Sequence, residues 1–190
     1  MVLIFDSETT GPKPETAELG SLGIVLLDQD LVTVDEIEVL YKPSIPMPEG
    51  ATRVHGLRDE ALEGCKHLSE DAEFVTELFS LADYNVAHNH RYDFTILSRD
   101  IPGLLPFRER AFCSMLRSAS ILRIPKPWGG RRSNQNDMWK WPSLDELAGF
   151  LGVSLDERTS QELHGALVDC RILANCLREM RRRYPELVPF

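Results

Sequence analysis

The sequence opens with Met-Val-Leu-Ile-Phe-Asp-Ser-Glu-Thr-Thr-Gly (residues 1–11), in which a short apolar run leads directly into two acids. The apolar run Val2–Phe5 predicts a short buried strand. Asp6 and Glu8 lie two residues apart at its end, so both carboxylates project from one face of the strand. Such a pair can bind two metal ions, because the shorter and the longer side chain reach different depths. Taken alone, the pair is more typical of a polar strand end that enters a loop.

Working outward from this strand, the next segments predict a meander. Leu22–Leu27 is a second apolar run, and Gln29-Asp30 follows it as a hairpin turn. Residues 31–41 alternate well enough for a third strand. Residues 42–50 carry three prolines and predict a loop.

Later segments alternate between helix and strand. Residues 70–82 have Phe74, Leu78 and Leu81 at helical spacing. The other expected elements are a strand at Tyr84–Ala87, a helix from about Asn89, a strand at Ala111–Met115, a capped helix from Ser143 to about Leu151, and a final helix over Gly165–Arg182. Three antiparallel strands followed by this alternation predict an α/β fold with a mixed sheet flanked by helices. We find no repeat and no linker, and we expect a single domain over residues 1–190.

Bulk properties narrow the class of protein. The chain has 190 residues, of which 43% are hydrophobic, and no stretch is long and apolar enough to cross a bilayer. The first residues lack the basic segment of a signal peptide, and the four cysteines show no CxxC pairing or zinc spacing. These features predict a cytoplasmic protein with reduced, mostly buried thiols. The net charge of −9 argues against a broad DNA-coating surface, but not against a small metal site that holds one strand end.

A second acidic element is Ala-His-Asn-His-Arg-Tyr-Asp-Phe (residues 87–94). Asn89 is a good N-cap residue after a strand, which places Asp93 in the early turns of a helix. Asp93 shares a helical face with Ile96 and Leu97 and should point inward, where a metal ion would compensate its charge. The alternative is an ordinary first-turn acid favoured by the helix dipole.

A third element is His-Gly-Ala-Leu-Val-Asp (residues 164–169). On one continuous helix, His164 and Asp169 would point in different directions. They can converge if His164 lies on a loop and Gly165 marks the start of the helix. A histidine beside metal ions is a natural general base, since its unperturbed pKa is about 6.5. A lone histidine would otherwise be interpreted as a capping or core residue.

Together these elements resemble the DEDDh family of 3′–5′ exonucleases, which includes polymerase proofreading subunits. Residues 5–11, 87–93 and 164–169 match its three motifs in order, with the H-x(4)-D spacing intact in the third. Weaker matches are Val-His-Gly-Leu (residues 54–57) and Ser-Leu-Asp-Glu-Leu (residues 143–147). Departures are mild, since Ser7 and Tyr92 occupy positions where other small and aromatic residues are also usual.

The resemblance implies a ribonuclease H-like fold and removal of nucleoside 5′-monophosphates from a 3′ end. It implies two Mg²⁺ or Mn²⁺ ions per site and His164 as general base, and the metal ligands carried over are Asp6, Glu8, Asp93 and Asp169. The oxygen-rich ligand set also favours these metals, with zinc as a minor alternative. Thr9, His55 and Asn89 are the expected contacts to the terminal nucleotide.

Several functions stay open at this level. We favour DNA with single-stranded or frayed 3′ ends as substrate, and a polymerase or another replication or repair protein as a candidate partner. An exoribonuclease that trims RNA or short oligonucleotides shares the same motifs, and only a contact to the 2′-OH would separate the two. A catalytically inactive nucleic-acid-binding module is disfavoured because all five catalytic positions are filled. A metal-dependent phosphatase would leave the H-x(4)-D element unexplained.

The segment from Pro125 to Ser143 holds all three tryptophans among several cations. Glycines and prolines predict a loop here. Aromatic and cationic side chains of this kind suit sequence-tolerant binding of single strands, so we expect Trp128 and Arg131 to contact substrate. The alternatives are a loop that the tryptophans pin onto the core and a patch that binds a protein partner.

Overall fold

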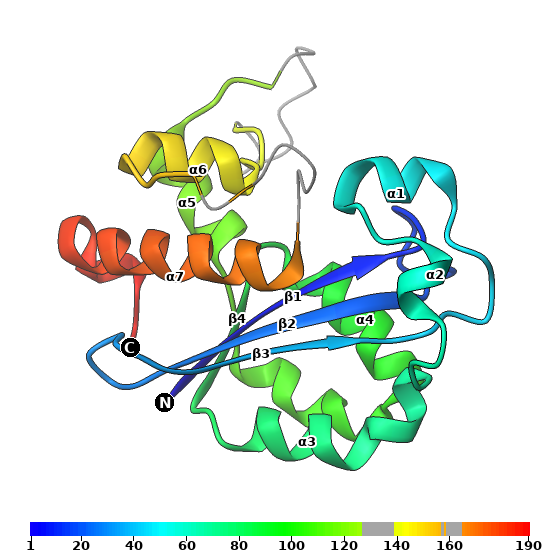
Figure 1. The fold of residues 1–190 in the computed structure, drawn as a ribbon. Helices are drawn as coiled ribbons and strands as arrows, with labels where there is room; N and C mark the ends of the chain where they lie inside the picture. The colour runs from blue at the N-terminus through cyan, green and yellow to red at the C-terminus, as the bar shows by residue number, and fades with distance from the viewer. Residues whose placement is uncertain (127–138, 157, 159–164) are drawn as a thin grey trace.

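A computed structural model describes residues 1–126, 139–156, 158 and 165–190 of the chain (Figure 1). Its central sheet has five strands in the order β3-β2-β1-β4-β5. The strands β1, β2 and β3 are antiparallel, and β4 and β5 add in parallel to β1. Their bounds are β1 Val2–Thr9, β2 Leu19–Leu27, β3 Thr33–Leu40, β4 Tyr84–Ala87 and β5 Ala111–Cys113. The expected mixed sheet is therefore confirmed, and the fold is ribonuclease H-like.

Helices cover both faces of this sheet (Figure 1). The α-helices are α1 Glu49–His55, α2 Asp59–Leu62, α3 Ala72–Ser80, α4 His90–Asp100, α5 Ser114–Leu122, α6 Leu144–Leu151 and α7 Ala166–Arg183. Short 3₁₀ segments are η1 Leu68–Asp71, η2 Pro102–Arg110 and η4 Pro185–Leu187. Among the described residues, no helix is both long and apolar enough to span a membrane.

The alternation of side chains along β1 divides the core into two layers. Val2 and Ile4 pack with the apolar face of α7 and with α6. Leu3 and Phe5 pack on the other face with α3 and α4. In that second layer Phe5, Phe79 and Phe94 form edge-to-face pairs with ring centroids 4.9–5.8 Å apart. The end of β1 that carries Asp6 and Glu8 therefore lies between α7 on one face of the sheet and α4 on the other.

Several expected boundaries are wrong by a few residues. The first strand continues past Phe5 to Thr9, and the second begins at Leu19 and not at Leu22. The third strand begins at Thr33 and not at residue 31, because Asp28 closes the turn by accepting backbone N–H bonds from Asp30 and Val32. Leu31 takes a left-handed conformation in that turn and is buried. The fifth strand stops at Cys113, and residues 114–122 continue as the helix α5, which the sequence analysis did not predict.

The helix expected over residues 70–82 exists, but its buried face differs from the predicted one. The structure has η1 followed by α3, and α3 buries Val75, Leu78 and Phe79. Phe74 and Leu81 are exposed. The capped helix predicted at Ser143 is confirmed, with the reciprocal Ser143–Glu146 bonds in place. All four cysteines are free, and three of them are buried.

Candidate active site

The carboxyl end of β1 supplies two acids to one face of the sheet. Asp6 and Glu8 continue the row of Val2 and Ile4, so they project toward α7. Ser7 lies between them and projects to the opposite face. The register of β1 with β2 shifts between Glu8 and Thr9, where regular pairing ends. The predicted arrangement of the Asp6–Glu8 pair at a strand end is confirmed.

The start of α7 brings a third acid to this pair. Gly165 is the extended N-cap residue, and the Asp169 N–H donates to its carbonyl at 2.8 Å in the first turn. Carboxylate oxygens of Asp6, Glu8 and Asp169 all lie within 4.8 Å of one another. Asp169 is buried, and the positive end of the helix dipole favours its negative charge. Gly165 thus marks the start of the helix, as the sequence predicts.

The start of α4 brings a fourth acid from the other face. Asp93 is 3% exposed, and the Ser7 hydroxyl donates to its carboxylate at 2.6 Å. Asn89 holds the N-cap position, but its side chain makes no capping hydrogen bond, and its backbone is left-handed with a φ of 88°. The expected capping role of the Asn89 side chain is therefore wrong. Asparagine suits this position because it tolerates the left-handed conformation better than most residues do.

All four acids line one open cleft of about 210 Å³. Its other lining residues are Ser7, Val54, His88, Asn89 and Tyr92. Asp93 lines the same cleft but is not part of the three-acid group within 4.8 Å. The structure thus brings together the four acids that the sequence analysis selected.

The pKa values of two of these acids, Asp6 and Asp93, are shifted upward. Burial raises the pKa of Asp6 well above its usual value, and the charges of Asp93, Glu8 and Asp169 raise it further. Burial likewise raises the pKa of Asp93 to about 7, although the hydrogen bond from Ser7 opposes this shift. Crowded carboxylates with such shifts favour either protonation or a bound cation.

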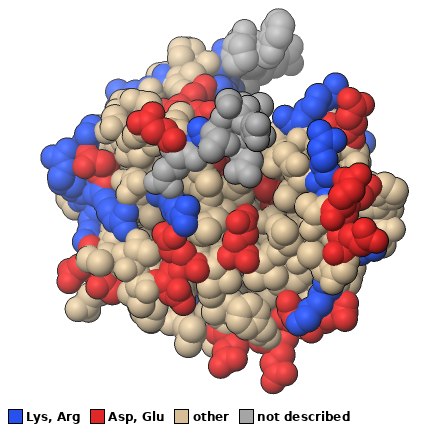
Figure 2. All heavy atoms as spheres, in the orientation of Figure 1, with Lys and Arg blue, Asp and Glu red and all other residues tan. Residues whose placement is uncertain are grey.

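The three arginines in the last turn of α7 lie far from this cluster. On the face shown in Figure 2, Lys and Arg side chains gather over the C-terminal end of α7, where Arg181, Arg182 and Arg183 lie in the last turn. Asp169 lies near the N-terminal end of the same helix, at a distance from these arginines of about 18–21 Å along the helix axis.

Arg158 is a site residue that the sequence analysis missed. Its Nη2 and Nε donate to one oxygen of Asp169 at 2.6 and 3.1 Å, and its Nη1 pairs with Asp145 at the start of α6. The Arg158 side chain is only 10% exposed. Nothing in its local sequence indicates this contact, because Asp169 follows it by eleven residues.

Thr9 and His55 lie against each other beside the cleft. Leu57 N–H donates to Nδ1 of His55, so the His55 Nε2 carries the proton and donates to the Thr9 carbonyl at 3.2 Å. The Thr9 hydroxyl contacts the Tyr92 hydroxyl at 2.6 Å. Both Thr9 and His55 are buried, whereas Val54 lines the cleft and is 47% exposed. Contact of Thr9 or His55 with a nucleotide stays a prediction.

The second motif also contains His88, whose side chain connects three segments of the chain in the structure. Its Nε2 donates to the Pro142 carbonyl at 2.9 Å, and its Nδ1 lies 2.9 Å from the Ser114 hydroxyl. Burial lowers the pKa of His88. These contacts tie the end of β4 to α5 and to the segment that precedes α6. His164, Trp128 and Arg131 lie outside the described residues, so their predicted roles stay predictions.

Comparison with known proteins agrees with this architecture. Residues 3–177 match the sequence model of the RNase_T family, described as exonuclease. The DNA polymerase III subunit epsilon of Pasteurella multocida is 28% identical over 179 residues, which cover 91% of this chain and 65% of that protein. This chain therefore spans just under two thirds of that relative's length.

Solved structures show the same fold. Exonuclease X in complex with 5′ overhanging duplex DNA superposes with a TM-score of 0.69 at 20% identity, covering 99% of this chain and 97% of that one. Exonuclease I of E. coli in complex with a dT13 oligonucleotide superposes with a TM-score of 0.73 at 17% identity, covering 98% of this chain and 42% of that one. The chain belongs to the exonuclease family, and the predicted membership among the DEDD-type 3′–5′ exonucleases is confirmed.

Proposed function

We propose that this protein removes nucleotides one at a time from the 3′ end of DNA by a reaction that depends on two bound metal ions. The observation that carries the proposal is the group of Asp6, Glu8 and Asp169, whose oxygens lie within 4.8 Å of one another in an open cleft. Asp93 completes the set at the same cleft. Without a cation, burial and mutual repulsion hold the pKa of Asp6 well above its usual value.

The donor set fits Mg²⁺ or Mn²⁺. All four candidate ligands are carboxylates, which are the hard oxygen ligands that these ions prefer. Oxygens bound to Mg²⁺ lie about 2.0–2.1 Å from the ion, so two of them are at most about 4.2 Å apart. Donors within 4.8 Å of one another can therefore share a cation after small adjustments. When bound, two such metals supply Lewis acidity to the attacking and leaving oxygens of the phosphodiester. We propose two ions per site, held by Asp6, Glu8, Asp93 and Asp169.

The protein's own residues supply the remaining chemistry. We assign His164 as the general base that takes a proton from the attacking water. Attack on the phosphorus breaks its bond to the 3′ oxygen of the preceding nucleotide. That oxygen takes up a proton and becomes a new 3′-OH, and a nucleoside 5′-monophosphate leaves. Ser7 orients Asp93 through its 2.6 Å hydrogen bond, and Arg158 restrains Asp169.

The substrate assignment rests on two supports. The cleft is open and lies beside buried Thr9 and His55. The relative named above is a DNA polymerase subunit, and two structures with this fold were solved with DNA. We propose single-stranded or frayed 3′ ends as substrate, with Thr9, His55 and Asn89 near the terminal nucleotide. We propose Trp128 and Arg131 on the path of the longer strand, and a polymerase as a candidate partner.

One assay tests the proposal. End-labelled single-stranded DNA, duplex DNA, RNA and circular single-stranded DNA are incubated with Mg²⁺, and the products are sized over time. We expect stepwise shortening of linear DNA from the 3′ end, no cutting of circles, and complete inhibition by EDTA. Cleavage that persists in EDTA contradicts the metal-dependent mechanism, and cutting of circles indicates an endonuclease. Faster shortening of RNA than of DNA would make the protein an exoribonuclease.

A second assay tests the proposed strand contacts. Trp128→Ala and Arg131→Ala should raise KM for a long single strand more than for a dinucleotide, because only the long strand would reach them. Trp141→Ala is the matched control, since Trp141 lies in the described part of the same segment and is 61% exposed. Equal KM values for both substrates in the two variants would remove these residues from the substrate path.

A further inference from the structure

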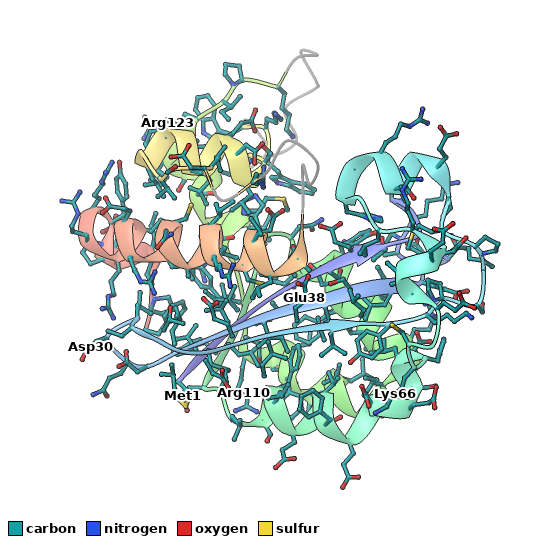
Figure 3. The ribbon with its side chains drawn as sticks, viewed as in Figure 1. Met1, Asp30, Glu38, Lys66, Arg110 and Arg123 are labelled. Carbon is teal, nitrogen blue, oxygen red and sulfur yellow. The ribbon has the colours of Figure 1, made fainter. Side chains whose placement is uncertain are left out.

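Gly23 lies in β2 directly between two acids. Its register partners are Asp6 on β1 and Glu38 on β3, the second of which is labelled in Figure 3. Directly opposite residues of antiparallel strands project to the same face. The face in question is the one that α7 covers, because Val25, two residues further along β2, packs in the α7 layer. Any side chain at position 23 would therefore point at α7.

The first turn of α7 rests on Gly23 with no space between them. A Cβ atom at this position would lie 2.3 Å from the carbonyl carbon of Ala166. It would lie 2.4 Å from the Ala166 oxygen and from the Leu167 nitrogen. These are backbone atoms, which cannot rotate away as a side chain can. Any residue larger than glycine would displace the start of α7 from the sheet.

A second contact holds the same turn in place. The thiol of Cys170 donates to the Gly23 carbonyl at 3.3 Å, and Cys170 is completely buried. Asp169 lies between the two contacts, three residues after Ala166 and one before Cys170. The distance of Asp169 from Asp6 thus depends on how closely α7 approaches β2.

We infer that Gly23 is a positioning residue of the active site, which sets the spacing of Asp169 from Asp6 and Glu8 by letting the backbone of α7 contact the sheet. The inference rests on the proposed function, because it assumes that these three acids share metal ions. Their oxygens lie within 4.8 Å of one another while the first turn of α7 contacts β2 at Gly23. A misplacement of about 1 Å can cost about 10²-fold in rate.

The test measures the affinity of the full chain for Mn²⁺, using electron paramagnetic resonance to quantify the free ion. Steady-state kinetics are measured on the same variants. Gly23→Ala should weaken Mn²⁺ binding by about 10–100-fold, the range seen when the support of a metal ligand is lost. It should lower kcat with little change in KM, and raised Mn²⁺ should restore part of the activity. Gly20→Ala is the matched control on β2. Its Cβ would lie 2.9 Å from the terminal methyl of Met47, which can rotate away, and at ordinary contact distances of 3.4 and 3.5 Å from Leu57 and the Glu8 carbonyl.

Cys170 variants keep the inference testable if Gly23→Ala does not fold. Cys170→Ala removes the hydrogen bond to Gly23 and should weaken Mn²⁺ binding several-fold, whereas Cys170→Ser keeps a donor and should restore it. Folded Gly23→Ala with the Mn²⁺ affinity of the wild type overturns the inference, as does equal binding by both Cys170 variants. If wild type and Asp6→Asn bind Mn²⁺ equally, the proposed function itself fails.

Discussion

The helices α4 and α7 each bring an aspartate to the cleft from the fourth residue of the helix, but they hold it differently. Asp93 follows β4 through a left-handed Asn89 and is held by a neutral hydroxyl, that of Ser7. Asp169 follows an extended Gly165 and is held by a cation, Arg158. The same place in a helix therefore yields two electrostatic situations. Within the described part of the chain, Asp93 has no cationic partner, whereas Asp169 is paired with Arg158.

The largest expected effect is loss of activity in both aspartate variants, with opposite effects on stability. Asp93→Asn and Asp169→Asn should each reduce hydrolysis to the background of the assay. In EDTA and above pH 7, Asp93→Asn should raise Tm above wild type, because it removes a buried charge that has no counter-ion among the described residues. Asp169→Asn should lower Tm, since losing one partner of a buried ion pair costs up to about 3–5 kcal/mol. Differential scanning calorimetry measures both, and equal shifts would remove the contrast between the two helices.

The second effect concerns only the α7 side, where His164 precedes the helix. His164→Ala should lower kcat by about 10²–10⁴-fold, the usual range for one acid–base group, and should largely spare Mn²⁺ binding. A general base acts in its neutral form, so wild-type kcat should rise with pH as this histidine loses its proton. The variant should lose this rise. An unchanged pH profile would make His164 a structural residue.

The third effect concerns only the α4 side. Ser7→Ala should lower kcat about 10–100-fold, because Asp93 loses the donor that orients it. Ser7→Thr keeps the hydroxyl and is the matched control, which should retain most of the activity. Loss of activity in both variants would point to packing and not to the hydrogen bond.

The smallest effect is a dependence of stability on pH. Folding raises the pKa of Asp93 to about 7, above the value near 3.9 of an unfolded chain. The folded state therefore binds this proton more tightly, and its stabilising effect is complete below pH 4 and is lost as pH rises toward 7. In EDTA the Tm of wild type should fall relative to that of Asp93→Asn across this window, by about 2–4 °C per kcal/mol for a chain of this size. A constant difference between the two Tm curves contradicts the shift, and saturating Mn²⁺ should abolish the dependence.

Much of the fold follows from local patterns in the sequence. The apolar runs of β1 and β2 and the capping box at Ser143 need no distant partner to be recognised, so the sequence predicts these elements. However, β1 ends four residues later and β2 begins three residues earlier than expected. Asp6 and Glu8 were placed on one face by the period of a strand alone. Gly165 was placed at the start of a helix because His164 and Asp169 can then converge, with His164 on a loop.

The errors arise where distant contacts decide. Phe74 and Leu81 have helical spacing, but η2 and the sheet bury the neighbouring face of α3 instead. Arg158 pairs with acids at the starts of two different helices, a relation that only the folded chain creates. Leu31 is a residue type that favours a strand, but it lies in a turn because the Asp28 side chain accepts hydrogen bonds from the backbone of Asp30 and Val32.

The hydrogen bond from Cys170 to the Gly23 carbonyl also provides a native reporter of local opening. The thiol is fully buried under the first turn of α7. Burial raises the pKa of Cys170, which disfavours the reactive thiolate form. An alkylating reagent can reach it only when that turn lifts from the sheet, so the rate of labelling measures how often the turn opens. Cys65, which is partly exposed, serves as the internal reference. If added Mn²⁺ slows the labelling of Cys170, the ratio of the two labelling rates gives the free energy by which the metal stabilises the closed state of this turn. The measurement needs no substrate.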